Sequence, residues 1–413
     1  MGRSAKHIVG LDIGTTKVCV IVAEPNENGS LDIVGFGTCP SKGLRKGVVI
    51  NLDATIDSIK SAVEEAELMA GVSVEKAFVG IAGGHVRGFN SRGVVAISGK
   101  DHEVTRADIA RVLNAARAVS IPPDREIFHV LPQEFIVDDQ EGIGDPVGMT
   151  GTRLEANVYI VTGSVSAMQN IVNCVNRAGI EVEDTVLEQL AASEATLTAD
   201  EKEMGVALID VGGGTTDLAL LERGAIRHIC VLPTGGDHFT NDIAVGLRTP
   251  VPEAERIKKK YGCALPSLVG EEDTIEVPSV GGRKSRVLSR QILCEIIQPR
   301  AEEIFSLINE EIVRTGFDKS INAGAVLTGG GSVMDGIPEI AEDVLDMPVR
   351  RAAPVNVAGL SDGVSSPVFA TPVGLVLYGH RHRTRRVEVQ PPTNPFFFTR
   401  MGERVKTWIQ ELF

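Results

Sequence analysis

Three apolar runs along the chain each lead into a short glycine-containing turn. Two of them precede the turns DIGTTK and DVGGGTTD, and a second strand-like run follows each turn. The third run, at 325–328, precedes GGGS and an apparent helix over 336–344. The aspartates that open the first two turns, Asp12 and Asp210, lie 198 residues apart. Two similar units at this separation predict a duplicated pair of domains.

Segments with apolar residues at helical spacing alternate with these strand patterns. One begins at Asn51 or Asp53 and ends at Gly71. Another begins near Thr105, whose spacing to Asp108 resembles a capping box. Further helices are predicted over 166–178, 186–197, 252–261 and 370–379.

The order of these elements predicts an α/β chain of two duplicated halves, each interrupted by one insertion. A separate segment follows the second half. The predicted boundaries are 1–84, 162–204 and 361–379 for the first half, 85–161 for its insertion, 205–240 and 319–360 for the second half, 241–318 for its insertion, 380–394 for a linker and 395–413 for a C-terminal helix.

The composition narrows the classes of function. A formal net charge of -14 argues against nucleic acid as a main partner. Six cysteines are scattered without a CxxC pair, which suits a reducing cytoplasm and argues against a zinc site. The sequence shows no signal peptide and no run of about 18 apolar residues. We therefore expect a cytoplasmic protein without a membrane span.

The turns offer groups suited to phosphate. Glycine lacks the Cβ that keeps a main chain away from a ligand, so consecutive N–H groups can converge on phosphate oxygens. Threonine hydroxyls add donors, and Asp12 or Asp210 can hold Mg²⁺ through its waters. A single glycine-rich turn is as often a tight hairpin, and Lys17 alone can be a solvated loop residue, so the repetition carries the argument. The predicted phosphate ligands are Gly14, Thr15, Thr16, Lys17, Gly212, Gly213, Gly214 and Thr215.

DIGTTK, DVGGGTTD and LTGGGS, in this order and in two halves, resemble the phosphate 1, phosphate 2 and adenosine motifs of the actin, Hsp70 and sugar-kinase superfamily. Within it, the chain resembles the FtsA family of bacterial cell-division proteins from about residue 6 to about residue 379, and again in its last fifteen or so residues. The runs TPVPEAERIKKKYGCALPSLVG and VPSVGGR carry the same pattern. The resemblance implies an actin-like (ribonuclease H-like) two-domain ATPase fold.

The resemblance further implies that ATP or ADP lies between the halves with Mg²⁺. The nucleotide would mainly control assembly, with weak ATPase activity at most. Glu255 and Lys258, three residues apart on one helical face, match residues that contact ribose and adenine in Hsp70-like proteins. A solvated charged helix would have the same composition. The other implied nucleotide ligands are Gly236, Gly329, Gly330 and Gly331.

Glu188 is the candidate catalytic residue. It falls where the first connecting helix of the superfamily points an acid at the attacking water, and a general base there needs a raised pKa or a water to orient. FtsA proteins usually have proline at the next position, whereas this chain has Gln189. The alternative interpretation of Glu188 is a capping or solvated glutamate.

The two insertions imply protein partners. Residues 85–161 resemble subdomain 1C, which supports head-to-tail self-assembly and contacts later division proteins in that family. Residues 241–318 resemble subdomain 2B, which receives the acidic C-terminal peptide of FtsZ, the tubulin homologue. A basic stretch there suits an acidic peptide. Its candidate residues are Arg283, Arg286 and Arg290. A decorative insert and plain solvation of the basic stretch are the respective alternatives.

The C-terminal segment, residues 395–413, is amphipathic. At ~100° per residue its apolar side chains fall within about 140° of arc. Fifteen or so residues give roughly 22 Å, too short for about 30 Å of hydrocarbon, so we expect the helix to lie in an anionic membrane interface. A helix docked on the protein is the alternative. The predicted membrane residues are Met401, Val405, Trp408, Ile409, Leu412 and Phe413.

Together these features predict an ATP-binding, actin-like cell-division protein that polymerises on the cytoplasmic face of the inner membrane at the septum. There it would tether FtsZ filaments and recruit later division proteins. A small-metabolite kinase of the same fold would need a catalytic aspartate and no membrane tail. An Hsp70-like chaperone would need a domain after residue 380, where 33 residues remain. A pilus-assembly relative shares the inserted-domain plan.

Overall fold

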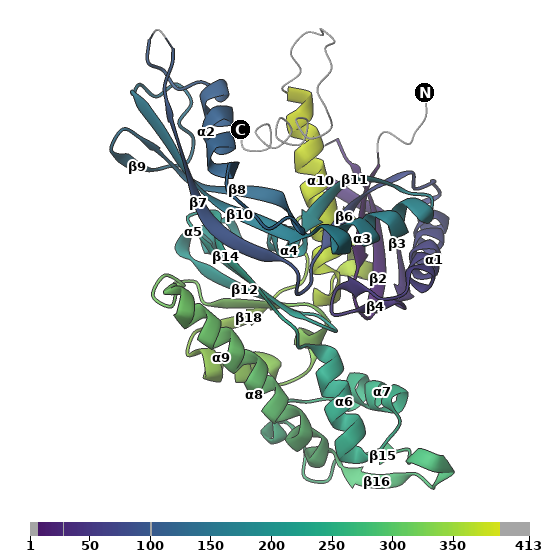
Figure 1. Cartoon of the computed structure of the whole chain (residues 1–413). Coiled ribbons are helices and arrows are strands. Elements are labelled where there is room, and N and C mark those ends of the chain that lie inside the picture. Colours follow the sequence, from purple (N-terminus) through teal and green to yellow (C-terminus); the bar gives the residue numbers. More distant parts are fainter. Residues whose placement is uncertain (1–6, 28, 100, 389–413) are drawn as a thin grey trace.

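The computed structural model describes residues 7–27, 29–99 and 101–388, and three large sheets set its architecture (Figure 1). One sheet belongs to each predicted half, and the third belongs to the insertion in the first half. In the part of the chain that is described, no helix is long and apolar enough to cross a bilayer.

The first-half sheet is covered by helices on both faces. Along β2, Val18 and Val20 pack toward α1 and α3, whereas Cys19 and Ile21 pack toward α10. A strand that is apolar on both sides is typical of such a covered sheet. The strand order is β11-β6-β1-β2-β3-β19, formed by β1 (Ile8–Ile13), β2 (Lys17–Pro25), β3 (Leu31–Pro40), β6 (Lys76–Ile81), β11 (Glu181–Leu187) and β19 (Val357–Gly359). The helices are α1 (Leu52–Ala70), α3 (Val165–Arg177), α4 (Glu188–Thr196) and α10 (Ala370–Glu388).

The predicted ends of α1 are confirmed. The side chain of Asn51 accepts a hydrogen bond from the N–H of Ala54, and Gly71 closes the helix with a φ of 67°. This left-handed conformation favours glycine because a Cβ would be strained there. A short hairpin of β4 (Leu44–Arg45) and β5 (Val48–Val49) precedes the helix.

The second half repeats the plan with a five-stranded sheet in the order β14-β13-β12-β17-β18. Helices α6, α7 and α8 and a small hairpin extend away from the sheet as the second insertion (Figure 1). The strands are β12 (Val206–Val211), β13 (Thr216–Glu222), β14 (Ala225–Leu232), β15 (Thr274–Val277), β16 (Arg286–Ser289), β17 (Ala325–Thr328) and β18 (Val349–Arg351). The helices are α5 (Ala199–Met204), α6 (Gly236–Leu247), α7 (Val251–Tyr261), α8 (Arg290–Thr315) and α9 (Ile337–Leu345).

The inserted subdomain of the first half is an antiparallel sheet with one helix. The capping box predicted at Thr105 and Asp108 is present at the start of α2 (Arg106–Arg117). The outer part of the sheet has its own core beneath α2, whereas Leu131 and Val161, nearer its base, join a core shared with both halves. The strand order is β7-β10-β8-β9, formed by β7 (Arg87–Ala96), β8 (Arg125–Val137), β9 (Gln140–Ile143) and β10 (Arg153–Ser164).

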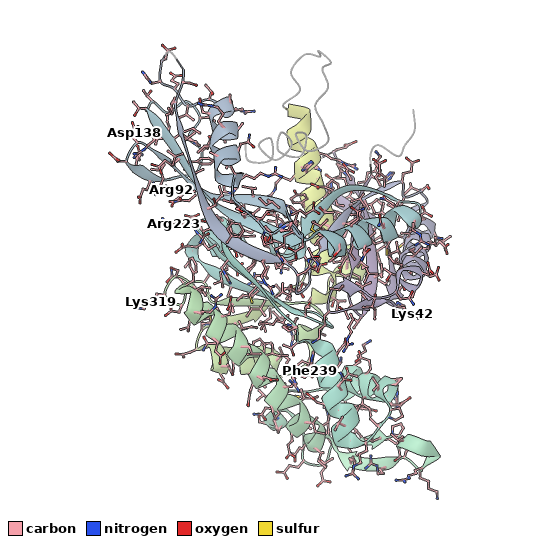
Figure 2. All side chains as sticks on the ribbon, in the orientation of Figure 1. Lys42, Arg92, Asp138, Arg223, Phe239 and Lys319 are labelled. Atoms are coloured by element: carbon pink, nitrogen blue, oxygen red, sulfur yellow. The ribbon has the colours of Figure 1, made fainter. Side chains whose placement is uncertain are left out.

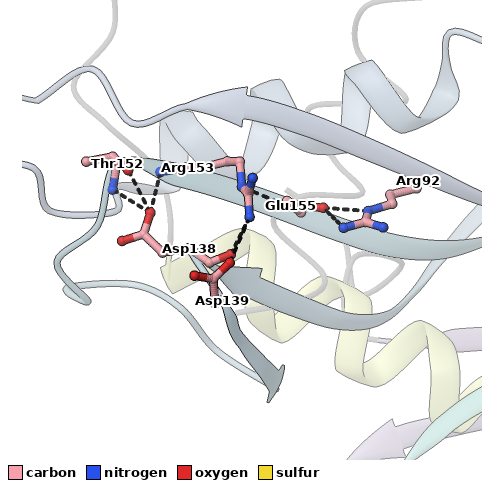
Figure 3. Close-up of polar contacts among 6 residues, drawn as sticks. All are labelled: Arg92, Asp138, Asp139, Thr152, Arg153 and Glu155. Atoms are coloured by element: carbon pink, nitrogen blue, oxygen red, sulfur yellow. Dashed lines mark hydrogen bonds and ion pairs between the residues drawn. The ribbon is translucent and has the colours of Figure 1, made fainter.

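Charged side chains on this subdomain are paired with one another (Figure 3). The buried Glu155 carboxylate lies between the guanidinium groups of Arg92 and Arg153. The Asp138 carboxylate accepts hydrogen bonds from the backbone N–H and hydroxyl of Thr152 and from the backbone N–H of Arg153.

Two predicted boundaries differ from the structure. Residues 380–388, predicted as the start of a linker, continue α10, because Arg381 pairs with Glu194 and Arg383 pairs with Glu183 in the first half. Strand β19, within the range 319–360 predicted for the second half, pairs with β3 of the first-half sheet. The predicted membrane residues in 395–413 lie outside the described residues.

Candidate functional site

A cleft of about 720 Å³ opens between the two halves, and all three glycine turns contribute to its walls. Phe239, near the start of α6 in Figure 2, is buried beside it. Every residue predicted to bind nucleotide or Mg²⁺ lines this cleft, as does Glu188. They are Asp12, Gly14, Thr15, Thr16, Lys17, Asp210, Gly212, Gly213, Gly214, Thr215, Gly236, Glu255, Lys258, Gly329, Gly330 and Gly331.

The first two turns are the tips of equivalent hairpins. The N–H of Gly14 donates to the carbonyl of Lys17 at 3.0 Å, and the N–H of Gly212 donates to the carbonyl of Thr215 at 2.9 Å. In each hairpin the aspartate lies at the end of the incoming strand. The residue paired with Asp12 is Cys19, whereas the residue paired with Asp210 is Asp217. The second hairpin therefore brings an extra carboxyl group to the cleft.

Glycine is required where the hairpins and the third turn approach one another. A Cβ on Gly213 would lie 2.3 Å from Cγ2 of Thr16, across the cleft, and a Cβ on Gly214 would lie 2.7 Å from the hydroxyl of Thr15. A Cβ on Gly329 would lie 2.1 Å from a carboxylate oxygen of Asp210, and Gly329 has a φ of 81°. A side chain at any of these three positions would force the turns apart.

Four carboxyl groups share the floor of the cleft, and each has a raised pKa. Burial is the largest cause in all four, and mutual repulsion adds to it for Asp12, Asp217 and Glu188. The pKa is about 6 for Asp12 and Asp210, where Lys17 opposes the rise, and about 8 for Asp217. The pKa of Glu188 is raised well above its usual value. The raised pKa values mean that these groups favour the protonated form until a bound cation balances their negative charge.

This donor set fits a hydrated divalent cation that carries phosphate. Hard oxygen donors on facing hairpins are the ligands that Mg²⁺ prefers, and it usually keeps several of its waters. Within the described part of the chain, no group of three or more His, Cys, Asp or Glu side chains is arranged to hold a metal ion directly. Contact of Asp12 and Asp210 with Mg²⁺ through water stays a prediction.

Glu188 is the first residue of α4, and its carboxyl group packs against Gly80 of β6. The next residue, Gln189, is 2% exposed and donates from Nε2 to Oδ1 of Asp217 at 2.7 Å. The hydroxyl of Thr215 donates to the other oxygen of Asp217 at 3.0 Å. Gln189 therefore ties the connecting helix to the second hairpin.

The far wall of the cleft comes from the second insertion. Lys258 donates to the carbonyl of Gly236 at 2.9 Å and pairs with Glu255 at 2.7 Å. The N–H groups of Gly236 and Asp237 donate to the carbonyls of Gly212 and Gly213, each at 2.8 Å. The start of α6 thus supports the second hairpin.

Three contributors to the cleft were not predicted as site residues. Asp217 closes the DVGGGTTD motif, so its position in the sequence was visible but its pairing with Asp210 was not. Thr371, at the start of α10, donates to Asp210 at 3.2 Å, and the carbonyl of Val368 accepts from Lys17 at 3.0 Å. No local pattern links residues so far apart in the chain.

The three arginines proposed for an acidic peptide differ in their contacts. Arg283 and Arg286 are exposed, although Arg286 also donates to the carbonyl of Leu247, whereas Arg290 lines the cleft and donates to the carbonyl of Tyr261 at 2.9 Å. Arg290 also pairs with Asp273 at 3.6 Å. Two of the three side chains are thus engaged within the second insertion.

Comparison with known families gives two matches. Residues 207–374 match the model of "Cell division protein FtsA", and residues 83–162 match the model of "SHS2 domain inserted in FTSA". The chain is 50% identical over 412 residues to a cell division protein FtsA from Pseudomonas aeruginosa, covering 99% of this chain and 98% of that one.

Two solved structures have similar folds at low sequence identity. One, titled PilM-PilN type IV pilus biogenesis complex, has a TM-score of 0.64 at 18% identity and covers 90% of this chain and 98% of that chain. Another, MreB5 of Spiroplasma citri bound to ADP, has a TM-score of 0.54 at 17% identity, covering 94% and 100%. At these identities the likeness establishes an actin-like fold.

Proposed function

The chain belongs to the cell division protein FtsA family, and from this premise we propose that it binds Mg²⁺–ATP in the cleft and uses the nucleotide to control its own assembly at the division site. The observation that carries the proposal is the convergence of three glycine turns and four carboxyl groups with raised pKa values on one cleft. Anion donors beside acids with raised pKa values are what a phosphate with its cation requires.

Roles for individual residues follow from their positions. The N–H groups of Gly212 to Gly214 and the hydroxyls of Thr15 and Thr16 would bind phosphate oxygens, with Lys17 as the cation. Bound Mg²⁺ would supply charge neutralisation and polarise the terminal phosphate. Glu188, once its pKa falls beside that charge, would orient or deprotonate a water. Glycines 329–331 would lie against the adenosine.

Outside the cleft, we propose that the second insertion holds the acidic C-terminal peptide of FtsZ and that residues 395–413 anchor the protein to an anionic membrane surface. Arg283 and Arg286 are both exposed, and Arg286 also donates to the carbonyl of Leu247, so Arg283 is the best placed of the three to meet a peptide. The inserted subdomain would serve self-assembly into filaments and contacts with later division proteins. One anchor binds weakly, so filaments that present many would bind far more tightly.

Co-sedimentation with anionic vesicles tests the proposal. The intact chain is compared with a chain ending at Glu388, which keeps all of α10, and each is assayed with Mg²⁺–ATP, with Mg²⁺–ADP and without nucleotide. We expect only the intact chain to pellet, with ATP increasing the yield. A Gly213→Val variant, whose side chain would meet Thr16, should lose the ATP effect but keep some vesicle binding.

Equal sedimentation of both chains, or of neither, would remove the anchor role of residues 395–413. The family membership argues against a metabolite kinase or a pilus-assembly role, since the 50% identity to an FtsA runs over nearly the whole chain. Failure of the wild type to bind ATP by equilibrium titration would remove the nucleotide role.

A further inference from the structure

A histidine of the inserted subdomain reaches the helix that carries Glu188. His129 lies on β8, is 2% exposed, and its Nε2 accepts the backbone N–H of Leu187 at 3.0 Å. Leu187 is the N-cap residue of α4 and has no side-chain cap of its own. The first N–H groups of a helix need a partner from elsewhere, and here the inserted subdomain supplies one.

This bond fixes the backbone one residue before Glu188. Glu188 has little freedom of its own, because Gly80 lies on one side and Gln189 is tied to Asp217 on the other. Removing the acceptor would leave the N–H of Leu187 buried without a partner, and the first turn of α4 would have to move to reach another. An oriented water tolerates little such movement, because misplacement by about 1 Å costs much of the rate of a positioned reaction.

The same subdomain also contacts the second half. The hydroxyl of Tyr159 accepts the N–H of Ile229 at 3.1 Å, and Nε2 of Gln133 donates to the carbonyl of Ile226 at 3.1 Å. Ile226 and Ile229 both lie on β14, the edge strand of the second-half sheet. Figure 2 shows Arg223, at the turn that leads into β14, beneath the part of the subdomain that carries Arg92. The inserted subdomain therefore contacts both halves, the first through β8 and the second through β8 and β10.

We propose that His129 is a positioning residue for Glu188, through which the inserted subdomain and the nucleotide cleft respond to each other. A partner that moves β8 changes the aim of Glu188, and a nucleotide that moves α4 changes β8, because such coupling is reciprocal. This inference rests on the proposed binding of ATP in the cleft.

The test compares His129→Leu with His129→Gln in the full chain. Leucine removes the acceptor, whereas the glutamine side chain is long enough to place an oxygen near the Nε2 position. We expect His129→Leu to slow single-turnover phosphate release from Mg²⁺–ATP by on the order of tenfold while changing ADP affinity less than about twofold, because Glu188 acts at the terminal phosphate. His129→Gln should recover most of the rate.

Amide hydrogen exchange provides a second readout on the same samples. Exchange at Leu187 should become faster in His129→Leu and return toward wild type in His129→Gln. In the wild type, Mg²⁺–ATP should alter exchange in residues 125–137, and His129→Leu should lose that response.

The outcomes distinguish a failure of the proposed nucleotide binding from a failure of the proposed role of His129. If the wild type binds no nucleotide, the proposed function fails and this inference falls with it. If the wild type binds nucleotide and His129→Leu matches it in phosphate release and in exchange at Leu187, only the inference is overturned. If His129→Leu loses rate and ADP affinity together and glutamine rescues neither, His129 supports the fold alone and the inference is again wrong.

Discussion

The carboxyl groups of the cleft and those of the inserted subdomain differ in how their charge is balanced. In the subdomain, Glu155 is buried between two arginines, and hydrogen bonds to the carboxylate hold the pKa of Asp138 below its usual value. In the cleft, Asp12, Asp210 and Asp217 have raised pKa values because burial outweighs what Lys17 and their hydrogen bonds provide. An acid paired with arginines stabilises the fold. Acids whose charge is not balanced by cations cost stability, and this is typical of a site that binds a ligand.

The contrast is sharpest at Asp217. Its pKa of about 8 lies above the unfolded value of 3.8, so its contribution to stability is fully present below pH 3.8 and is lost as pH rises toward 8. Asp217→Asn should therefore raise the free energy of unfolding of the nucleotide-free protein at pH 8.5, by on the order of 3 kcal/mol, and have little effect near pH 4. Urea denaturation at both pH values measures this.

Asp138→Asn is the matched control, because the pKa of Asp138 is lowered. Its contribution is present above its usual pKa and is lost as pH falls, so the variant should be less stable than wild type at pH 8.5. A loss of stability at pH 8.5 in Asp217→Asn as well would contradict the distinction between the two regions.

Replacing Glu155, the paired acid of the subdomain, should lower the free energy of unfolding, which is the opposite of the effect at Asp217. Glu155→Ala removes a buried carboxylate and leaves two arginines that are about half exposed and can be solvated, so we expect a loss of about 2 kcal/mol. Denaturant unfolding followed by circular dichroism measures it. Arg92→Ala should cost less, because Arg153 remains. An unchanged midpoint in Glu155→Ala would mean that the pairs are only surface contacts.

Binding of Mg²⁺–ADP should depend on pH through Asp12 and Asp210. Both have a pKa of about 6 in the cation-free protein, so raising the pH from 6 to 8 removes their protons and favours a divalent cation. Each group is about half ionised at pH 6 and almost fully ionised at pH 8, so we expect Mg²⁺-dependent affinity to rise by about fourfold over this range. Isothermal titration measures it, with ADP and chelator as the control, where affinity should fall. Affinity that is independent of pH would remove these two acids from the cation's surroundings.

The smallest change in the free energy of unfolding is expected at the cap of α2. Thr105→Ala removes a capping box far from the cleft and should cost about 1 kcal/mol. Hydrogen exchange in residues 106–117 should become faster, with ADP affinity unchanged. A change in ADP affinity would show that the outer subdomain is coupled to the cleft more widely than through His129.

Much of the fold could be predicted from local patterns. The hairpins at Asp12 and Asp210, the cap at Asn51 and the capping box at Thr105 are short-range signals, and their structures match them. The glycine turns also indicated which residues line the cleft, since each turn follows a strand of a duplicated sheet.

What could not be predicted depends on contacts between distant residues. The hydrogen bond from Gln189 to Asp217 joins residues 28 apart in the chain, and the one from Thr371 to Asp210 joins residues 161 apart. The local sequence around these residues does not predict either bond. The sequence of residues 380–386 is basic and lacks apolar periodicity, so it resembles a linker. Arg381 and Arg383 instead pair with Glu194 and Glu183, which lie in other elements.

The longer α10 has a consequence for orientation. The described part of α10 runs to Glu388, and six residues lie between it and the segment predicted to be amphipathic, which begins at 395. Six residues reach at most about 20 Å, whereas a linker starting at 380 would reach about 50 Å. In the proposed anchor, the body would therefore lie within about 20 Å of the membrane-bound segment. The direction of α10 would then limit which face of the protein can lie toward the membrane and which toward its partners.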